Sequence, residues 1–111
     1  MDFAVKVVKF FGKLPKTDEA RATGRHFLRA GTSAAANYRE ACRAKSEADF
    51  ISKMGAAVEE ADESVFWLEL IEKAALCSAT EIQPLSTEAN ELLCIFSTSL
   101  NTAKRNTSKA K

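Results

Sequence analysis

The feature that most constrains this chain is a run of small residues inside a pattern that otherwise reads as a helix. The run covers residues 29–41 and has the sequence RAGTSAAANYREA. Small side chains let a second helix approach closely, so the run predicts a helix–helix contact. It ends in a polar group, Asn37, Tyr38, Arg39 and Glu40. Because a buried polar group without a partner costs about 1–3 kcal/mol, we expect these residues to find partners on a neighbouring helix.

Length and composition predict one globular domain over residues 1–111 that is not all-β. Four Gly and two Pro are too few for a turn-rich all-β protein. No apolar run approaches the roughly 20 residues that a membrane span needs, so no membrane segment is expected. The first residues lack the pattern of a signal peptide. The three cysteines are odd in number and widely spaced, which favours a reducing compartment, the cytoplasm.

Charge is segregated along the chain. Residues 1–45 carry ten basic and four acidic residues, residues 46–100 carry two and eleven, and residues 101–111 carry four and none. This segregation either pairs helices with one another, within or between subunits, or leaves a basic face for a partner.

The first two helices are expected at about residues 2–14 and 18–45. The first ends before Pro15, because the residue before proline avoids the α region. It starts at the initiator methionine, and we expect a longer version of the chain to add one or two turns. Thr17 or Asp18 is a suitable N-cap for the second. Gly24 and Gly31 weaken a helix interior by roughly 1 kcal/mol each, so they indicate close helix approach or a kink at residues 31–33.

The last two helices are expected at about residues 47–78 and 81–104, followed by a frayed tail at residues 105–111. Ser46 and Asp49 form a capping-box pattern at the start of the third helix. Thr80 and Gln83 form a similar pattern at the start of the fourth.

Basic side chains form the candidate nucleic-acid surface. Arg21, Arg25 and Arg29 recur every four residues and make one stripe, which is either a solvated face or a site for phosphates or a second subunit. The full candidate set is Lys6, Lys9, Lys13, Arg21, Arg25, Arg29, Lys104 and Arg105.

Acidic residues of the third helix are expected to pair with arginines of the second rather than bind metal. Di-iron bundles use two Glu-x-x-His pairs, and His26 is the only histidine. No cofactor or catalytic residue is expected, and His26 is about two turns from Ser33, too far to act as its base. The expected structural polar cluster is Ser33, Asn37, Arg39, Glu40, Glu60 and Glu63. Replacing Asn37 by Leu or Glu40 by Ala should then cost about 1–3 kcal/mol.

Apolar residues surround the third helix from residue 65 to residue 76. A helix that is apolar all round is buried on more than one side. Phe66 and Trp67 therefore indicate either a subunit interface or packing beneath the first helix and the connections.

The residues at 28–41, 44–53, 59–70 and 84–92 resemble the bacterial four helix bundle protein family, also called the 23S ribosomal RNA intervening-sequence protein family. The most specific element is the Thr-Ser…Ala-Asn-Tyr-Arg-Glu-Ala signature within the first segment. His26 and Ala30 stand where Gln and Ser are more usual. The resemblance implies an all-α fold, a left-handed antiparallel up-down four-helix bundle, that assembles as a ring-like homopentamer. Members are similar to the accessory protein of diversity-generating retroelements, which binds nucleic acid and a reverse transcriptase through a basic surface.

Two functional hypotheses follow. In the first, the chain is a non-enzymatic homo-oligomer that binds RNA or DNA through its basic residues. In the second, it is a structural or adaptor oligomer that docks a protein partner on its apolar surface.

Overall fold

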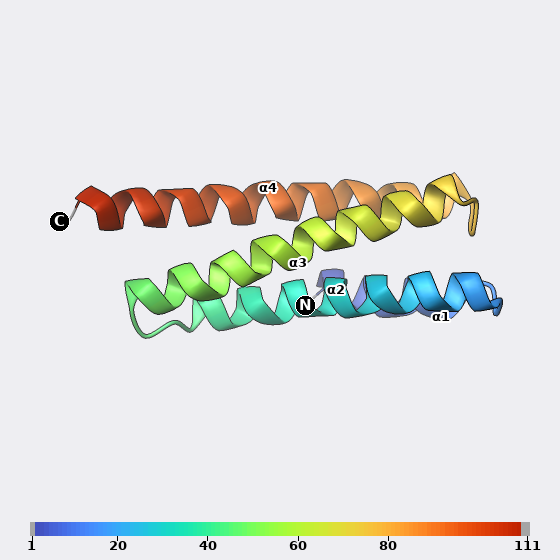
Figure 1. Ribbon diagram of the computed structural model, residues 1–111, viewed down its shortest axis with the longest axis horizontal. Helices are drawn as coiled ribbons and strands as arrows, with labels where there is room; N and C mark the ends of the chain where they lie inside the picture. The colour runs from blue at the N-terminus through green and yellow to red at the C-terminus, as the bar shows by residue number, and fades with distance from the viewer. Residues whose placement is uncertain (1, 110–111) are drawn as a thin grey trace.

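The described residues form four helices. The helices run up and down along one long axis (Figure 1). A computed structural model describes residues 2–109, and its helices are α1 (Asp2–Lys13), α2 (Asp18–Cys42), α3 (Glu47–Lys73) and α4 (Ala79–Lys109). The molecule measures 53 × 20 × 20 Å. Residues 2–109 contain no strand, which confirms the all-α four-helix prediction. No helix in this range has the length and apolar character that crossing a membrane requires.

The short helix α1 divides the bundle into two halves. α1 has 12 residues, whereas α2, α3 and α4 have 25, 27 and 31. α1 packs on α2 and touches α4, and α3 packs on α2 and α4. α1 and α3 therefore lie on opposite sides of the pair formed by α2 and α4. We call the half that α1 covers the closed half and the other, where three helices pack alone, the open half (Figure 1).

The two halves have different cores. The Phe10 and Phe27 rings meet edge to face in the closed half, with centroids 5.6 Å apart. The other buried members of this hydrophobic cluster are Phe3, Val7, Leu14, Leu68, Ile71, Ile82, Leu85 and Ala89. Buried residues of the open half are mostly small, and they are Ala34, Ala41, Met54, Ala57, Ala61, Phe96 and Leu100.

Two glycines of α2 allow α1 to approach closely. A Cβ atom built on Gly24 would lie 2.6 Å from Cδ1 of Leu14, and one on Gly31 would lie 2.8 Å from Cγ2 of Val7. Because α2 is one continuous helix through residues 31–33, close approach is the alternative that the structure supports.

Local capping sets most helix ends. Oγ1 of Thr17 accepts from the Ala20 N–H at 3.3 Å, so Thr17 is the N-cap and Asp18 is not. Oγ of Ser46 accepts from the Asp49 N–H at 3.0 Å, which confirms the predicted cap of α3. α2 ends at Cys42, three residues earlier than predicted, because Arg43 leaves the helical conformation with φ −108° and ψ 15°.

The prediction that the third helix reaches residue 78 was wrong. α3 ends at Lys73, and Ala75 has a left-handed φ of 55°. The Leu76 N–H donates to the Ile71 carbonyl at 3.1 Å and the Ala75 N–H to the Glu72 carbonyl at 3.0 Å. This is a Schellman motif, and it turns the chain back although the apolar periodicity continues to Leu76.

The fourth helix begins earlier and ends later than predicted. Ile82 and Glu81 donate their N–H groups to the Ser78 carbonyl, so Ser78 precedes the helix and Thr80 lies inside it, not at a capping box. Residues 105–109 continue α4 instead of fraying. The last two residues of the predicted tail, 110–111, lie outside the described residues, as does residue 1.

Candidate nucleic-acid and self-association surfaces

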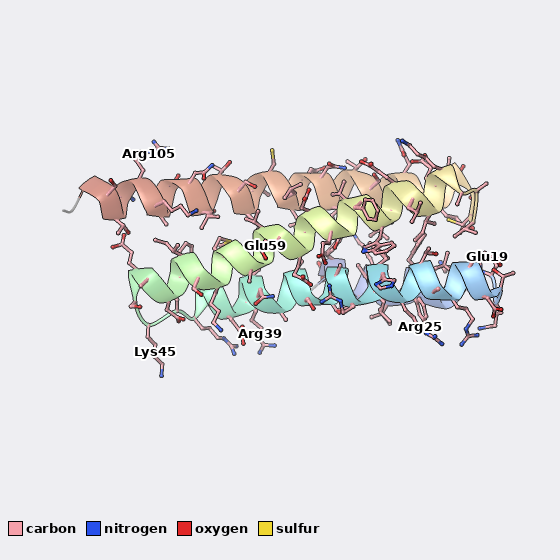
Figure 2. All side chains as sticks on the ribbon, viewed as in Figure 1. Glu19, Arg25, Arg39, Lys45, Glu59 and Arg105 are labelled. Atoms are coloured by element: carbon pink, nitrogen blue, oxygen red, sulfur yellow. The ribbon has the colours of Figure 1, made fainter. Side chains whose placement is uncertain are left out.

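Exposed arginines follow the outer edge of α2, and we call this row the basic edge. Arg21, Arg25, Arg39 and Arg43 are all exposed. Figure 2 shows Arg25 and Arg39 projecting away from the bundle on the same side, with Lys45 of the following loop beside them. From its first to its last arginine the edge is about 33 Å long, at 1.5 Å per helical residue. Only Arg21 and Arg25 were predicted from the sequence as nucleic-acid residues, although Arg39 and Arg43 recur at the same helical spacing.

Arg29 does not belong to the basic edge. Its guanidinium donates to Oε2 of Glu60 at 3.1 Å and to Oε2 of Glu63 at 2.8 Å. The Arg29 side chain is 59% exposed and that of Glu60 is 17% exposed. The predicted pairing between α2 arginines and α3 acids is thus confirmed for Arg29, and it removes this residue from the predicted stripe.

The lysines of α1 face α4 rather than α2. Nζ of Lys6 donates to Oε1 of Glu88 at 2.9 Å, and this bond raises the pKa of the Lys6 amine above its usual 10.5. Lys9 and Lys13 line a surface hollow together with Glu81 at the start of α4. A raised folded-state pKa means that the pair stabilises the fold fully below pH 10.5 and is lost as pH rises through the folded value.

The two basic residues of α4 lie on a third surface. Lys104 and Arg105 are exposed. Figure 2 shows Arg105 on the edge of the molecule opposite Arg25 and Arg39. The eight candidate nucleic-acid residues are therefore distributed over separate surfaces, and the basic edge holds two of them.

The predicted polar cluster does not form as one unit. Nδ2 of Asn37 donates to the Ser33 carbonyl of its own helix at 2.9 Å rather than to a group on α3. Oε2 of Glu40 lies 3.5 Å from Nζ of Lys53, and both side chains are exposed. Arg39 is exposed on the basic edge. Glu40 therefore has the expected partner on α3, although the pair is exposed. The expectation of one buried network was wrong, because Asn37 bonds within α2 and Arg39 is exposed.

The two aromatic residues predicted at a subunit interface differ in exposure. Phe66 is 55% exposed on the outer side of α3. Trp67 is partly buried, and its ring stacks on His26 with centroids 4.4 Å apart and an angle of 10°. His26 therefore packs against an aromatic ring, a contact that sequence reasoning missed.

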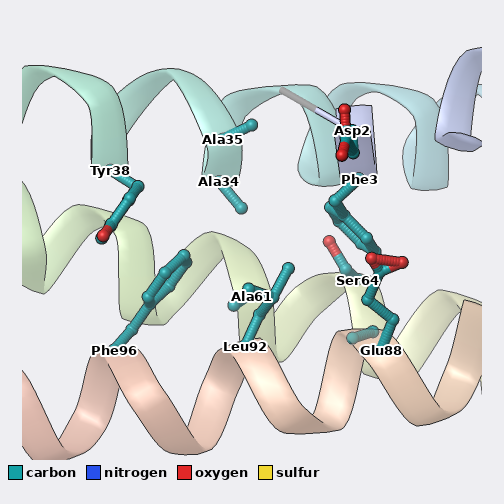
Figure 3. A pocket seen from close by; sticks show the side chains of 11 residues that line it. Asp2, Phe3, Ala34, Ala35, Tyr38, Ala61, Ser64, Glu88, Leu92 and Phe96 are labelled. Atoms are coloured by element: carbon teal, nitrogen blue, oxygen red, sulfur yellow. The ribbon is translucent and has the colours of Figure 1, made fainter. Parts of the chain in front are cut away.

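The groove between α2 and α4 continues beyond the start of α1, and we call this stretch the open groove. Figure 3 shows Tyr38 of α2 facing Phe96 of α4 across it, with Ala34 and Leu92 nearby. The two rings stack with centroids 4.8 Å apart, and Tyr38 is 40% exposed. The cavity holds about 350 Å³, and Asp2 and Phe3 of α1 line it with them. A second hollow shares Ala35 and Tyr38 and extends along α2 to Arg39, Cys42 and Arg43.

Residues 2–109 offer no group of three or more His, Cys, Asp or Glu side chains that could hold a metal ion. Cys42, Cys77 and Cys94 are all free thiols. Burial raises the pKa of the Cys77 thiol, and Glu81 and Glu72 add to the effect.

Comparisons with known proteins confirm the family resemblance. The family model described as 23S rRNA-intervening sequence protein matches residues 1–98. The fold is similar to the crystal structure of a protein of unknown function from the S23 ribosomal protein family of Bacteroides thetaiotaomicron. That chain is 31% identical, with a TM-score of 0.82, and the match covers 89% of this chain and 92% of that one. No curated protein matches the sequence.

Proposed function

We propose that this chain, which belongs to the 23S rRNA-intervening sequence protein family, is a non-enzymatic, self-associating helical bundle that binds RNA or DNA through the basic edge. The alignment of three exposed arginines on α2 with Arg43, directly after its end, carries the nucleic-acid part of the proposal. Arginine forms bidentate bonds with phosphate, and a row of them can follow a nucleic-acid backbone. Because the proposed contacts are to phosphates, binding should discriminate little between sequences and should weaken steeply with salt.

Self-association is supported by apolar side chains left on the surface. Among residues 2–109, Phe66 is the most exposed large apolar residue, followed by Ile95 at 54%. A ring-like homopentamer is the form that the family resemblance suggests. Free thiols at all three cysteines support a reducing, cytoplasmic setting. The stacking of His26 on Trp67 supports a packing role for the single histidine rather than a catalytic one.

The test of nucleic-acid binding is fluorescence anisotropy of a labelled structured RNA and a matched DNA at several salt concentrations. The Arg21→Ala/Arg25→Ala variant should bind about tenfold more weakly, equivalent to about 1.4 kcal/mol, and should show a shallower salt dependence. Lys104→Ala/Arg105→Ala is the matched control, since it removes the same charge from another surface, and it should bind as the parent does. No binding at low salt, or equal binding by both variants, would contradict the proposal.

A second candidate is an adaptor that docks a protein partner on the apolar surface around Phe66 and Trp67. The exposure of Phe66 favours it as much as it favours self-association. If Trp67→Ala leaves the solution mass unchanged, Trp67 is not needed between subunits and is available to a partner. Absence of nucleic-acid binding together with capture of a specific protein that Phe66→Ala abolishes would favour this candidate.

A further inference from the structure

We infer that the hollow between α1 and α4 binds a free α-amino acid with a large apolar side chain. We call it the α1–α4 hollow, and the residues that line it are Lys6, Lys9, Phe10, Lys13, Thr80, Glu81, Pro84, Leu85 and Glu88. None of them belongs to the basic edge. The inference therefore goes beyond the proposed function and does not depend on it.

The α1–α4 hollow forms because α1 packs closely on only one of its two neighbours. Gly24 and Gly31 let α1 approach α2, whereas α4 presents Pro84 and Leu85 to α1 and only touches it. The hollow holds about 380 Å³, a volume typical of sites for small molecules. From the first to the last lysine of its α1 wall it is about 10 Å long, at 1.5 Å per helical residue.

The floor of the hollow is apolar, and one end is closed. Phe10 and Leu85 are buried and form the floor, and Pro84 lies beside them. At one end Nζ of Lys6 lies 2.9 Å from Oε1 of Glu88, so an ion pair joins the two walls. The floor therefore suits an apolar side chain that ends at this pair.

The other end of the hollow carries charges of both signs that do not pair with each other. α1 and α4 run antiparallel, so Lys13, seven residues after Lys6, lies opposite Glu81, seven residues before Glu88 (Figure 1). Lys9 stands one turn further in on the α1 wall. Within residues 2–109, the ion pairs leave Lys9, Lys13 and Glu81 without a partner. A ligand that carries both charges can therefore bind between the walls.

A proline adds a hydrogen-bond acceptor at the same end. Pro84 lies inside α4 and has no backbone N–H, so the Thr80 carbonyl lacks the donor that normally stands four residues later. Thr80 and Pro84 both line the hollow. The first turns of α4 thus present a carbonyl oxygen close to the Glu81 carboxylate.

These groups match an α-amino acid better than a ligand with one charge. The lysines of α1 donate to its carboxylate, and its ammonium donates to the Glu81 carboxylate and the Thr80 carbonyl. Its apolar side chain then covers the floor. A simple carboxylate would leave Glu81 as a repelling charge, and a simple amine would do the same with Lys9 and Lys13. A residue within a peptide has neither charge.

The experiment is a titration of the ¹⁵N-labelled chain with L-phenylalanine, followed by NMR. Two analogues test the charges, because 3-phenylpropionate lacks the ammonium and phenethylamine lacks the carboxylate. Phenylalanine should shift the amide signals of the residues that line the hollow and should bind about tenfold more tightly than either analogue. N-acetylphenylalanine amide, which resembles a peptide residue, should not shift them.

Variants of the two walls test each charge separately. Lys9→Gln/Lys13→Gln should bind phenylalanine about tenfold more weakly and phenethylamine no more weakly than the parent. Glu81→Gln should also lose about tenfold for phenylalanine, yet bind 3-phenylpropionate at least as well as the parent. Lys104→Gln and Glu91→Gln are the matched controls, since they remove single charges elsewhere on α4, and both should bind as the parent does.

Pro84→Ala separates binding from stability. The new N–H can donate to the Thr80 carbonyl, so the variant should melt at a higher temperature and bind phenylalanine severalfold more weakly. A purely structural role for this turn predicts no loss of binding.

Three results would overturn the inference. They are no shift at the hollow with millimolar phenylalanine, equal binding of all three compounds, and tighter binding of 3-phenylpropionate than of phenylalanine. The last would identify a site for amphipathic anions instead. Circular dichroism melts check that each variant folds.

Discussion

The closed and open halves of the bundle share α2, α3 and α4 but differ in what fills the space between them. In the closed half, α1 lies over two glycines of α2 and completes a core of aromatic and aliphatic side chains. In the open half, the three helices close around alanines, and Tyr38 and Phe96 form the wall of a groove. The comparison shows how one additional helix converts a groove into a core. Four mutational tests probe this difference, from the largest expected effect to the smallest.

The largest effect is expected from removing an aromatic ring in each half. Phe27→Ala should lower the free energy of unfolding by about 3–5 kcal/mol, because the ring is fully buried and its loss leaves a closed cavity. Phe96→Ala should cost about 1.5–3 kcal/mol, because its ring borders the groove and the vacated space opens to solvent. Urea unfolding at one protein concentration measures both. Equal losses would show that the groove wall is packed as tightly as the core.

Replacing a glycine by alanine should lower the free energy of unfolding in the closed half and raise it in the open half. Gly31→Ala should destabilise the fold by about 1–2 kcal/mol, because the new Cβ meets the stiff, branched Val7 side chain. Gly55→Ala should stabilise it by about 0.5–1 kcal/mol, because nothing lies within 4 Å of the added atom and alanine is the better helix former. The same urea unfolding assay compares the two variants. A gain in stability for both would show that α1 lies further from α2 than the structure places it.

A smaller gain is expected at the turn that ends α3 in the closed half. Ala75 holds a left-handed conformation, φ 55°, which costs a residue with a Cβ atom about 1–2 kcal/mol. Ala75→Gly should therefore raise the free energy of unfolding by about 1 kcal/mol. Ala74→Gly is the control, since Ala74 has φ −80° and gains nothing from glycine. Equal effects of both substitutions would contradict the Schellman motif.

The smallest effects are expected from the ion pairs between α2 and α3. Glu40→Ala should change stability by no more than about 0.5 kcal/mol, because its side chain is 58% exposed. Glu60→Ala should cost somewhat more, about 0.5–1 kcal/mol, because its carboxylate is 17% exposed and binds Arg29. Thermal melts of both variants, with and without added salt, distinguish the two losses of stability. A loss in the free energy of unfolding above about 2 kcal/mol for Glu40→Ala would support the buried polar cluster that the sequence predicted.

The features that could be predicted from the sequence depend mostly on residues that are close together in the chain. Helix positions and the Thr17 and Ser46 caps depend on residues within a few positions of one another, so periodicity and capping patterns located them. The predictions were wrong where a local interaction favoured a different structure from the one that the sequence pattern indicated. Apolar periodicity ran past the end of α3, and the Schellman turn at Ala75 overrode it. Asn37 bonded within its own helix, although a partner on α3 was expected.

The candidate surfaces depended on arrangement rather than on pattern. The sequence could place Arg21, Arg25 and Arg29 on one helix, but the position of Glu60 and Glu63 on α3 removed Arg29 from the exposed row. The open groove has no signature in the sequence, because its walls are formed by Ala34 and Tyr38 of α2 and by Leu92 and Phe96 of α4, which are far apart along the chain. Helix formation is set by interactions between residues a few positions apart, and it can therefore be predicted from the sequence. Which faces become core, groove or charged edge is set by residues that meet across helices, and only their packing in three dimensions brings these together.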